Sequence, residues 1–431
     1  MILTNARVLT FDGENRVLDS GSVEVRADGA IGFVKRGRAR GQDVLDADVV
    51  DAGGRLLMPA LINCHSHLYS TLARGIALPS PPPADFPEIL RKLWWRLDRA
   101  LNLEDVYCSA LIGLIDSAKC GVGTVIDHHA SPNACAGSLD AVERAFCKVG
   151  LRGATCYETS DRDGPATAAA AIAENVRFIE RRRPNGVVGA AFGLHAAFTL
   201  GDRTLRACAE ANQPLGAAFH IHVSEDRSDA HAVGRLDRLG ILNERTLAAH
   251  CVHVTAAERR LLSRRGVNAI HNPQSNCNNA VGTAPVAELF GAGVLVGLGS
   301  DGYSPRLWDE FKTAIHLQKL RARDPRAGYA EAYAAAFQNN RAIVRKIWGW
   351  ELGRVETGAG ADLVLIDYFP PTPLDPGNLF GHLLFGVSNA PVDSLMVNGR
   401  WVLRDKQCVN VDERRTAEKA AARARALWDR F

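Results

Sequence analysis

The chain has 431 residues, of which 47% are hydrophobic and 23% are charged, values that are ordinary for a globular protein and argue against extensive disorder. The formal net charge of +3 is too small to predict nucleic-acid binding, and no apolar stretch reaches the roughly 20 residues of a membrane helix. Because the ten cysteines are scattered without a C-x-x-C pair and the first residues lack a secretory pattern, we expect a cytoplasmic protein.

Both ends of the chain have the short apolar runs and turn signals of β-structure. Residues 1–58 contain several such runs, and residues 361–431 contain more. Among the latter, Asn398-Gly399 is a pair that favours a tight hairpin turn. The last stretch is rich in Ala, Arg and Glu and predicts a helix with Asp412 as its N-cap. We therefore expect one small composite domain, a β-sandwich with a C-terminal helix, built from both chain ends.

The middle of the chain, residues 59–360, alternates between short β-prone runs and helical stretches. The runs cover residues 56–64, 124–129, 151–157, 187–196, 216–223, 246–254, 267–272 and 294–301. One helical stretch, residues 88–101, has the apolar spacing of a buried helix face, and the Pro-rich residues 79–87 predict an irregular loop. Because the strand–helix alternation repeats eight times, it predicts an α/β fold of the (β/α)₈ barrel type.

Polar residues occur at the C-terminal ends of these runs. In barrels of this type the catalytic side chains gather there, because the loops form a pocket over a rigid base. Residues that can bind a metal or move protons at these ends are His65, His67, His128, His129, Glu158, His195, His222, Glu225, His250, His271 and Asp301. A random draw would mostly place aliphatic and small residues there, so the coincidence favours a functional site.

Four of these residues form a typical catalytic ligand set. Because residues i and i+2 of a strand share a face, His65 and His67 can reach one ion. With His222 and Asp301 they supply imidazole and carboxylate ligands that suit Zn²⁺ or Fe²⁺ and leave a position for water. Glu225 is then a candidate for moving protons. The competing interpretations are a turn aspartate for Asp301 and a surface carboxylate for Glu225.

The remaining histidines are assigned less directly. We expect His220 and His253 to be structural or to support the ligands from behind. Of the adjacent His128 and His129, one is expected to line the pocket and the other to point away, because neighbouring strand residues face opposite sides.

The motifs "MPALINCHSHL", "HVSE", "AHCVH", "HNPQSN" and "GLGSDG" resemble, in this order, those of the metal-dependent amidohydrolase superfamily. The resemblance is to its cytosine/guanine-deaminase and chlorohydrolase branch, the ATZ/TRZ-like proteins. The segments "KLWWRLDRAL", "TVIDHHASP" and "GHLLFG" are similar to the SsnA-type aminohydrolases within that branch. Ala60 and Cys64 stand where the superfamily more often has Gly and Ala, which leaves the specificity of the pocket open.

Carried over by position, the resemblance implies these ligands of a single divalent ion, Zn²⁺ first and Fe²⁺ as the alternative: His65, His67, His222 and Asp301. It implies that Glu225 shuttles a proton, that His250 polarises the attacked centre and that Asp301 takes the last proton. The candidate substrate contacts are His195, His128 and Asn276. Two-metal relatives use a bridging lysine that the corresponding segments lack, so one ion is favoured, although Glu158 could bridge a second.

The activity implied by the resemblance is hydrolytic deamination of a small N-heterocycle. Attack of metal-bound hydroxide on an amidine-like carbon would release ammonia, which is hydrolysis of a C–N bond other than a peptide bond. The alternatives are a ring hydrolase for cyclic amides such as hydantoins or imidazolones, a hydrolase that expels another leaving group, and an inactive scaffold. The resemblance also suggests a homodimer whose partners are only the heterocycle and water.

Overall fold

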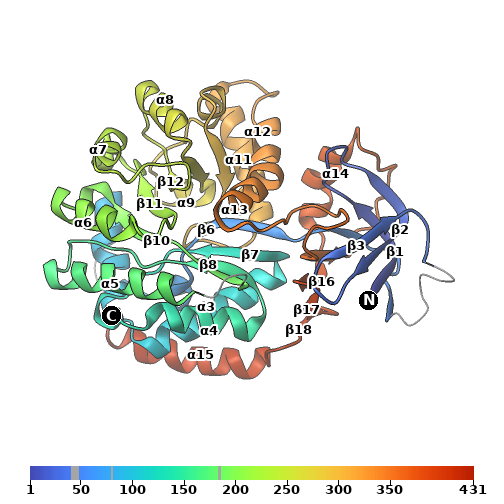
Figure 1. Ribbon diagram of the computed structural model, residues 1–431, viewed down its shortest axis with the longest axis horizontal. Helices are drawn as coiled ribbons and strands as arrows, with labels where there is room; N and C mark the ends of the chain where they lie inside the picture. The colour runs from blue at the N-terminus through green and yellow to red at the C-terminus, as the bar shows by residue number, and fades with distance from the viewer. Residues whose placement is uncertain (40–47, 79–80, 183–185) are drawn as a thin grey trace.

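The computed structural model describes residues 1–39, 48–78, 81–182 and 186–431, and three β-sheets organise this part of the chain. One sheet of nine strands lies at one end of the molecule, and two parallel sheets lie in the larger body beside it. Figure 1 shows the helices arranged around the outside of the larger body, with the N-terminus at the smaller end. The α/β class predicted from the sequence is confirmed.

The nine-stranded sheet combines both chain ends. Its strands are β1 (Ile2–Leu9), β2 (Val17–Val25), β3 (Ile31–Lys35), β4 (Val49–Asp51), β5 (Leu56–Pro59), β15 (Leu363–Ile366), β16 (Val392–Val397), β17 (Arg400–Arg404) and β18 (Gln407–Cys408). The antiparallel pair of β5 and β15 joins the two halves. Between β16 and β17, Asn398 and Gly399 have φ values of 50° and 71°, as the predicted hairpin turn requires.

Both faces of this sheet are covered. Leu57 and Leu363 are buried in a cluster within the small sheet region, whereas the alternate residues Leu56 and Val364 are buried in the cluster of the larger body. Successive strand residues point to opposite faces, so this alternation places β5 and β15 between two cores. The small sheet is therefore attached to the larger body through apolar burial.

The two parallel sheets contain nine strands. One has β6 (Leu61–Ser66), β7 (Val122–Asp127), β8 (Arg152–Thr155) and β9 (Val188–Ala190), and the other has β10 (Phe192–Ala196), β11 (Phe219–Val223), β12 (Leu247–His250), β13 (Asn268–His271) and β14 (Leu295–Leu298). All eight predicted runs contain a strand, but the first and fourth each divide, at Ala60 and at Ala191. Isolated parallel bridges pair Ser66 with Asp301 and Thr159 with Leu194.

Helices separate the strands along the chain. They are α1 (Phe86–Ile89), α2 (Trp95–Ala100), α3 (Leu103–Lys119), α4 (Ser138–Val149), α5 (Pro165–Arg181), α6 (Asp202–Asn212), α7 (Ala232–Arg238), α8 (Ala256–Arg265), α9 (Pro273–Asn278), α10 (Val286–Gly291), α11 (Leu307–Ala322), α12 (Tyr329–Tyr333), α13 (Asn340–Trp348), α14 (Leu379–Phe385) and α15 (Glu413–Trp428). The predicted helix 88–101 is less regular than expected, because a π-helical segment, Leu90–Trp94, joins α1 to α2.

The Pro-rich segment ends earlier than expected. Residues 79–80 lie outside the described residues, and α1 already begins at Phe86, inside the predicted loop 79–87. Asp85 caps this helix by accepting a hydrogen bond from the backbone N–H of Glu88, and Pro87 occupies its first turn, where the missing N–H costs nothing.

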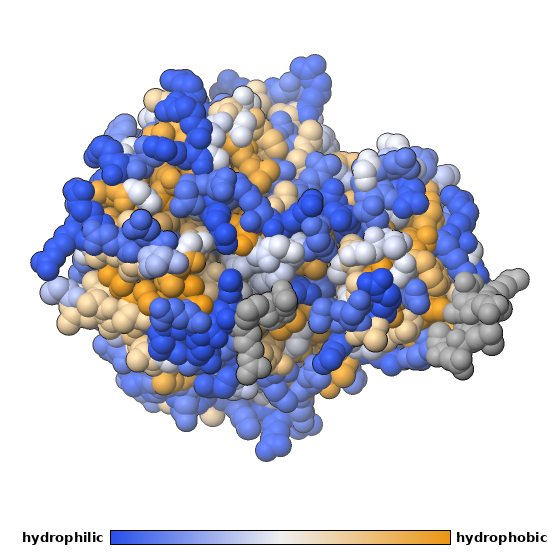
Figure 2. Space-filling model, viewed as in Figure 1, coloured by the Kyte–Doolittle hydropathy of each residue, from blue (hydrophilic) through white to orange (hydrophobic). Residues whose placement is uncertain are grey.

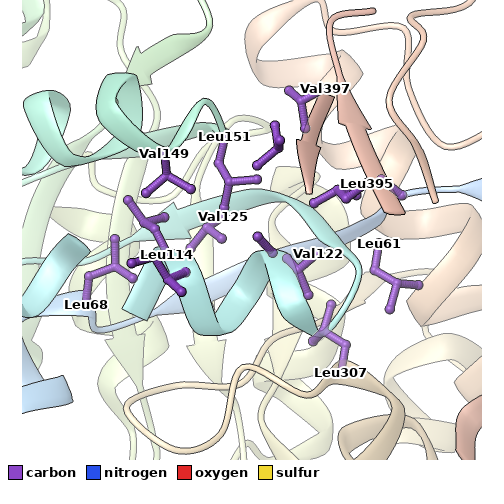
Figure 3. Close-up of a cluster of buried hydrophobic side chains, with 14 of the residues drawn as sticks. Leu61, Leu68, Leu114, Val122, Val125, Val149, Leu151, Leu307, Leu395 and Val397 are labelled. Atoms are coloured by element: carbon purple, nitrogen blue, oxygen red, sulfur yellow. The ribbon is translucent and has the colours of Figure 1, made fainter. Parts of the chain in front are cut away.

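The core of the larger body connects it to the small sheet. Figure 3 shows Val125 of β7 beside Leu114 of α3, and Val122 farther along β7 on the side of the junction, where Leu395 and Val397 of β16 lie. These five side chains are at most 2% exposed. Complete burial of a Val or Leu side chain contributes about 1.5–3 kcal/mol, so this junction holds the two parts together firmly.

The last helix lies against the larger body instead of the sheet formed by the chain ends. Asp412 caps α15 as predicted, by accepting a hydrogen bond from the backbone N–H of Arg415. Leu427 is buried against the body, and Trp428 donates a hydrogen bond to the carbonyl of Leu72. Figure 2 shows hydrophilic residues over most of the visible surface, with apolar residues in small patches. Among the described residues, no helix has the length and apolar character needed to cross a membrane.

Candidate active site

Three strands of the larger body end at one point and bring together four side chains. His65 lies near the end of β6, His67 follows it, His222 lies in β11, and Asp301 follows β14. The Nε2 atom of His67 is 3.1 Å from Nε2 of His222 and 2.9 Å from Oδ1 of Asp301. The same Oδ1 atom is 3.3 Å from Nε2 of His65. In a tetrahedral zinc site the ligand atoms lie about 3.3 Å apart, so these distances fit one ion.

Hydrogen bonding orients two of these imidazoles so that their Nε2 atoms face each other and the carboxylate of Asp301. The Nδ1–H groups of His67 and His222 donate to the carbonyls of His128 and His195, at 2.6 and 2.7 Å. In neutral rings, both Nε2 atoms therefore carry lone pairs, and these point at each other and at the carboxylate of Asp301. Such an arrangement is repulsive unless a positive charge lies between the atoms. These side chains therefore fit a divalent ion, and the hydrogen bond at Nδ1 orients each of the two imidazoles toward it.

The charges of the buried carboxylates support the same conclusion. Burial alone would raise the pKa of Asp301, but its contacts with His65 and His67 hold that pKa well below its usual value. Burial alone would lower the pKa of His67, but Asp301 and Glu158 raise it to about 10. The surrounding carboxylates therefore favour positive charge at this point, which a proton or a metal ion can supply.

The backbone around the site is unusual. Ser224, His250, Cys251 and Asp301 all have positive φ values, between 49° and 72°. Residues other than glycine rarely adopt this conformation, and it tends to occur where a fold must aim a functional side chain. Nearby, a Cβ atom at Gly299 would lie 2.9 Å from the backbone nitrogen of His65, so only glycine allows β14 to approach β6 this closely.

Beside the proposed ligands lie the two residues expected to act in catalysis. Glu225 is buried, which raises its pKa to about 7, and its Oε2 atom is 3.5 Å from Nε2 of His250. The Nδ1–H of His250 donates to Oδ1 of Asn276 at 2.8 Å, so Nε2 faces Glu225 and Asp301. A carboxyl group with a pKa near 7 can both take and give a proton at neutral pH.

A pocket opens onto the proposed ligands. The following residues are among those that line it: His67, Tyr69, Phe86, Trp94, Trp95, Asp98, Arg162, His195, Phe198, His222, Glu225, Asn279, Asp301 and Tyr303. The predicted substrate contact His195 is one of them. The other two, His128 and Asn276, are not among the lining residues, because His128 contacts Glu158 and the carbonyl of His220, and Asn276 holds His250.

The pocket wall contains a buried ion pair that was not predicted from the sequence. Arg162 donates to Oδ2 of Asp98, which is 1% exposed. Oδ1 of Asp98 and Nε1 of the neighbouring Trp95 have no hydrogen-bond partner in the described chain. The signal that could have found Asp98 is its place on the predicted buried face of the helix, one residue after Leu97 and three before Leu101.

Three other candidate residues do not belong to the proposed ligand set. Glu158 lines the pocket beside the ligands, and its Oε1 atom lies 3.3 Å from Nδ1 of His67 and 3.2 Å from Nδ1 of His128. His129 points away from the ligands to Ser131, with Nε2 and Oγ 2.9 Å apart. His271 is buried, and neither of its ring nitrogens has a hydrogen-bond partner in the described residues.

The chain is similar in sequence to proteins of a known family. Residues 56–402 match the amidohydrolase family. The chain belongs to this family. This amidohydrolase is 32% identical to a protein of Desulforudis audaxviator named 5-methylthioadenosine/S-adenosylhomocysteine deaminase, over 88% of the chain and 89% of the relative. It is 30% identical to a protein of Methanosarcina mazei named 5'-deoxyadenosine deaminase, over 99% of the chain and 98% of the relative.

Solved structures share the fold of this amidohydrolase. An adenosine deaminase from Xanthomonas campestris with bound zinc has a TM-score of 0.84, with 24% identity and coverage of 100% of the chain and 98% of that structure. An atrazine chlorohydrolase from Arthrobacter aurescens in complex with zinc has a TM-score of 0.80, with 21% identity and 99% coverage of both chains. The family match and the two deaminase relatives confirm the resemblance to the deaminase branch, and the solved structures confirm the fold.

Proposed function

We propose that the protein is a metal-dependent hydrolytic deaminase that removes an amino group, as ammonia, from a small N-heterocycle. The names of the two deaminase relatives support an adenine-like ring as the first class of substrate to test. Zn²⁺ is the proposed ion, because three imidazoles and one carboxylate with room for water are typical of catalytic zinc sites. Fe²⁺ is the alternative, since it accepts the same ligand types.

The observation that carries this proposal is the convergence of lone pairs at one point beside a proton-transferring carboxyl group. Nε2 of His67, Nε2 of His222 and Oδ1 of Asp301 meet there, and Glu225 lies at the same end of the pocket. A purely structural metal site would close its ligand shell with protein atoms. Here the shell opens into the pocket, so water and substrate can reach it.

The chain's own residues then divide the chemistry among themselves. A divalent ion in this site supplies Lewis acidity and lowers the pKa of a water molecule. Glu225 takes a proton from the attacking water and passes it to a ring nitrogen of the substrate. His250, 3.5 Å from Glu225, stabilises the negative charge that develops at the attacked centre when its Nε2 carries a proton. Asp301 accepts the remaining proton of the attacking water, this proton passes to the departing amino group, and the group leaves as ammonia.

The pocket wall is suited to a flat ring with polar edges. Trp94 and Trp95 provide aromatic surface, and His195 lies on the strand-end side. Asp98 and Arg162, which also line the pocket, add a carboxylate and a guanidinium group to this wall.

We also propose that the two parallel sheets form one (β/α)₈ barrel, residues 59–360, flanked by a β-sandwich domain whose strands come from residues 1–58 and 361–431, while α15 packs on the barrel. The bridges from Ser66 to Asp301 and from Thr159 to Leu194 support closure of the barrel, because each connects a segment that follows or ends a strand of one sheet with a segment of the other sheet. The β5–β15 pair supports the composite domain. In this arrangement the site lies where the barrel strands end.

The test of the function is an ammonia-release screen. Protein loaded with Zn²⁺ or with Fe²⁺ is incubated with adenine nucleosides and other amino-substituted N-heterocycles, and both ammonia and metal per chain are measured. We expect ammonia from at least one ring and one ion per chain. A product formed without ammonia would instead indicate another leaving group, and two ions per chain would favour a ring hydrolase.

Substitution of Glu225 separates proton transfer from metal binding. We expect Glu225→Gln to keep one ion per chain and to lose turnover by about 10²- to 10⁴-fold, because the amide cannot accept the proton. His65→Ala is the contrasting variant and should lose the ion itself. A Glu225→Gln protein with nearly wild-type turnover, or a His65→Ala protein that binds one ion as tightly as the wild type, would contradict these roles.

A further inference from the structure

A second group of buried metal-ligand types lies behind the proposed ion site. His128, Cys156 and His220 each place a potential ligand atom within 4.8 Å of the other two, and all three are buried. His220 belongs to β11, two residues before the proposed ligand His222, and Cys156 follows β8. The proposed mechanism uses none of these three side chains.

The hydrogen bonds of this group can be assigned in one consistent way, with a donor facing an acceptor at each contact. If Nε2 of His65 binds the ion, its ring nitrogen Nδ1 carries hydrogen and donates to Nε2 of His220, 2.8 Å away. His220 must then carry its own hydrogen on Nδ1, which faces Sγ of Cys156 at 3.7 Å. The thiol of Cys156 donates in turn to the carbonyl of Asp127, also at 3.7 Å. Every donor in this chain of contacts meets an acceptor.

The same contacts argue against a second ion in this group. Nε2 of His220 is occupied by His65, and the Nε2–H of His128 donates to the carbonyl of His220 at 3.1 Å. The other nitrogen of His128 lies 3.2 Å from Oε1 of Glu158. With these atoms committed, the group has no three free lone pairs that converge on one point.

We propose that His220 is a positioning residue that holds His65 in the tautomer and orientation needed for metal binding, and that Cys156 holds His220 in turn. This inference rests on the metal site of the proposed function. His67 and His222 receive the same kind of support from backbone carbonyls, which substitution cannot remove. His65 is the ligand among these three that depends on a side chain, so its support can be tested directly.

Two amide variants separate hydrogen bonding from packing. The oxygen of Gln can take the position of Nε2 and accept from His65, whereas the shorter Asn reaches only the position of Nδ1. We expect His220→Asn and His220→Phe to weaken zinc binding by about 10- to 100-fold, the usual effect of losing a group that orients a metal-bound histidine. His220→Gln should weaken it by less than about tenfold.

A matched pair of cysteine variants tests the end of the chain of contacts. Cys156→Ala removes the partner of His220, and we expect weaker zinc binding than in the wild type. Cys208→Ala removes a thiol that is also fully buried, in α6, and we expect no change in zinc binding. Equal zinc affinity in these two variants would remove Cys156 from the proposal.

The readouts are the zinc dissociation constant, measured by competition with a chromogenic chelator, and the absorption spectrum of the Co²⁺-loaded protein. Circular dichroism and the melting temperature identify any variant that has not folded.

Three results would overturn the inference. One is that His220→Gln, when folded, binds zinc as poorly as folded His220→Asn. Another is that His220→Phe binds zinc with unchanged affinity. A sulfur-to-cobalt charge-transfer band in the wild type would also overturn it, because Cys156 would then be a ligand. A wild-type protein that binds no ion would overturn the proposed metal site together with this inference, whereas the other outcomes leave the metal site standing.

Discussion

At the residue scale, burial decides which charge each ionisable group can hold. Burial raises the pKa of Glu225 to about 7, which suits proton transfer, and it also raises the pKa of Asp229 to about 7. Glu310, on α11, is completely buried with its pKa raised well above the usual value, and its Oε1 atom has no hydrogen-bond partner in the described chain. Such carboxyl groups favour the protonated form and therefore make stability depend on pH.

Glu310, which is not itself a proposed metal ligand, allows this dependence to be tested. Its pKa is higher in the folded than in the unfolded chain, so the folded state binds more protons and stability falls as pH rises above about 4.5. Glu310→Gln cannot ionise, and we expect its melting temperature relative to the wild type to increase between pH 5 and pH 8. The control is Glu418→Gln, at a side chain that is 65% exposed, where the difference should not change with pH. A pH-independent difference for Glu310→Gln would contradict the assignment.

At the element scale, the ends of helices and strands carry much of the specific information. Capping boxes begin α3 at Asn102 and α8 at Thr255, and each satisfies backbone N–H groups that the helix itself leaves free. The strands of the site end differently, because β12 ends with His250 in the left-handed region and Asp301 has the same conformation after β14. Helix ends are thus stabilised locally, whereas strand ends at the site are held by the rest of the fold.

The capping box of α8 gives the prediction at this scale. Oγ1 of Thr255 accepts from the backbone N–H of Glu258 at 3.2 Å, and the Glu258 carboxylate accepts from the backbone N–H of Thr255 at 2.9 Å. Thr255→Ala should lower the free energy of unfolding by about 1 kcal/mol, as measured by urea denaturation. Arg264→Ala, at an exposed position of the same helix, is the control and should change it by less than about 0.5 kcal/mol. Equal effects of the two substitutions would mean that the cap does not stabilise α8.

At the scale of the whole molecule, the two ends of the chain pack against different parts of the structure. The N-terminal strands pair with strands from the C-terminal region, while α15 returns to the larger body and packs on α3. There Arg423 and Arg430 both donate to Asp105, whose side chain is completely buried. The C-terminal helix therefore neutralises a buried carboxylate of the body that it covers.

Removing one of these arginines should lower the stability of the folded protein. We expect Arg423→Met to lower the free energy of unfolding by about 2 kcal/mol, because a hydrogen bond to a buried charged group is lost while the apolar stem is kept. Arg414→Met, on the same helix but 91% exposed, removes only a surface ion pair with Glu418 and should cost less than about 0.5 kcal/mol. Chemical denaturation of both variants checks the difference. If the two losses are the same size, Asp105 does not depend on α15.

The sequence by itself determined the elements and the chemistry of the strand ends. Strand periodicity placed His65 and His67 on one face, the Asn398-Gly399 pair predicted its turn, and Asp412 predicted its cap, because each depends on neighbours within a few residues. The proposed ligand set was also predicted from local position, since parallel strands that end in polar residues present them at the same edge.

Only the tertiary structure decided which side chains meet across the fold. It divided one predicted run at Ala60, so that β5 joins the small sheet and β6 the larger body. It paired Asp98 with Arg162 in the pocket wall and placed His220 behind His65. Local pattern cannot predict such contacts, because they join segments 64 and 155 positions apart, and their geometry is set by how whole strands and helices pack.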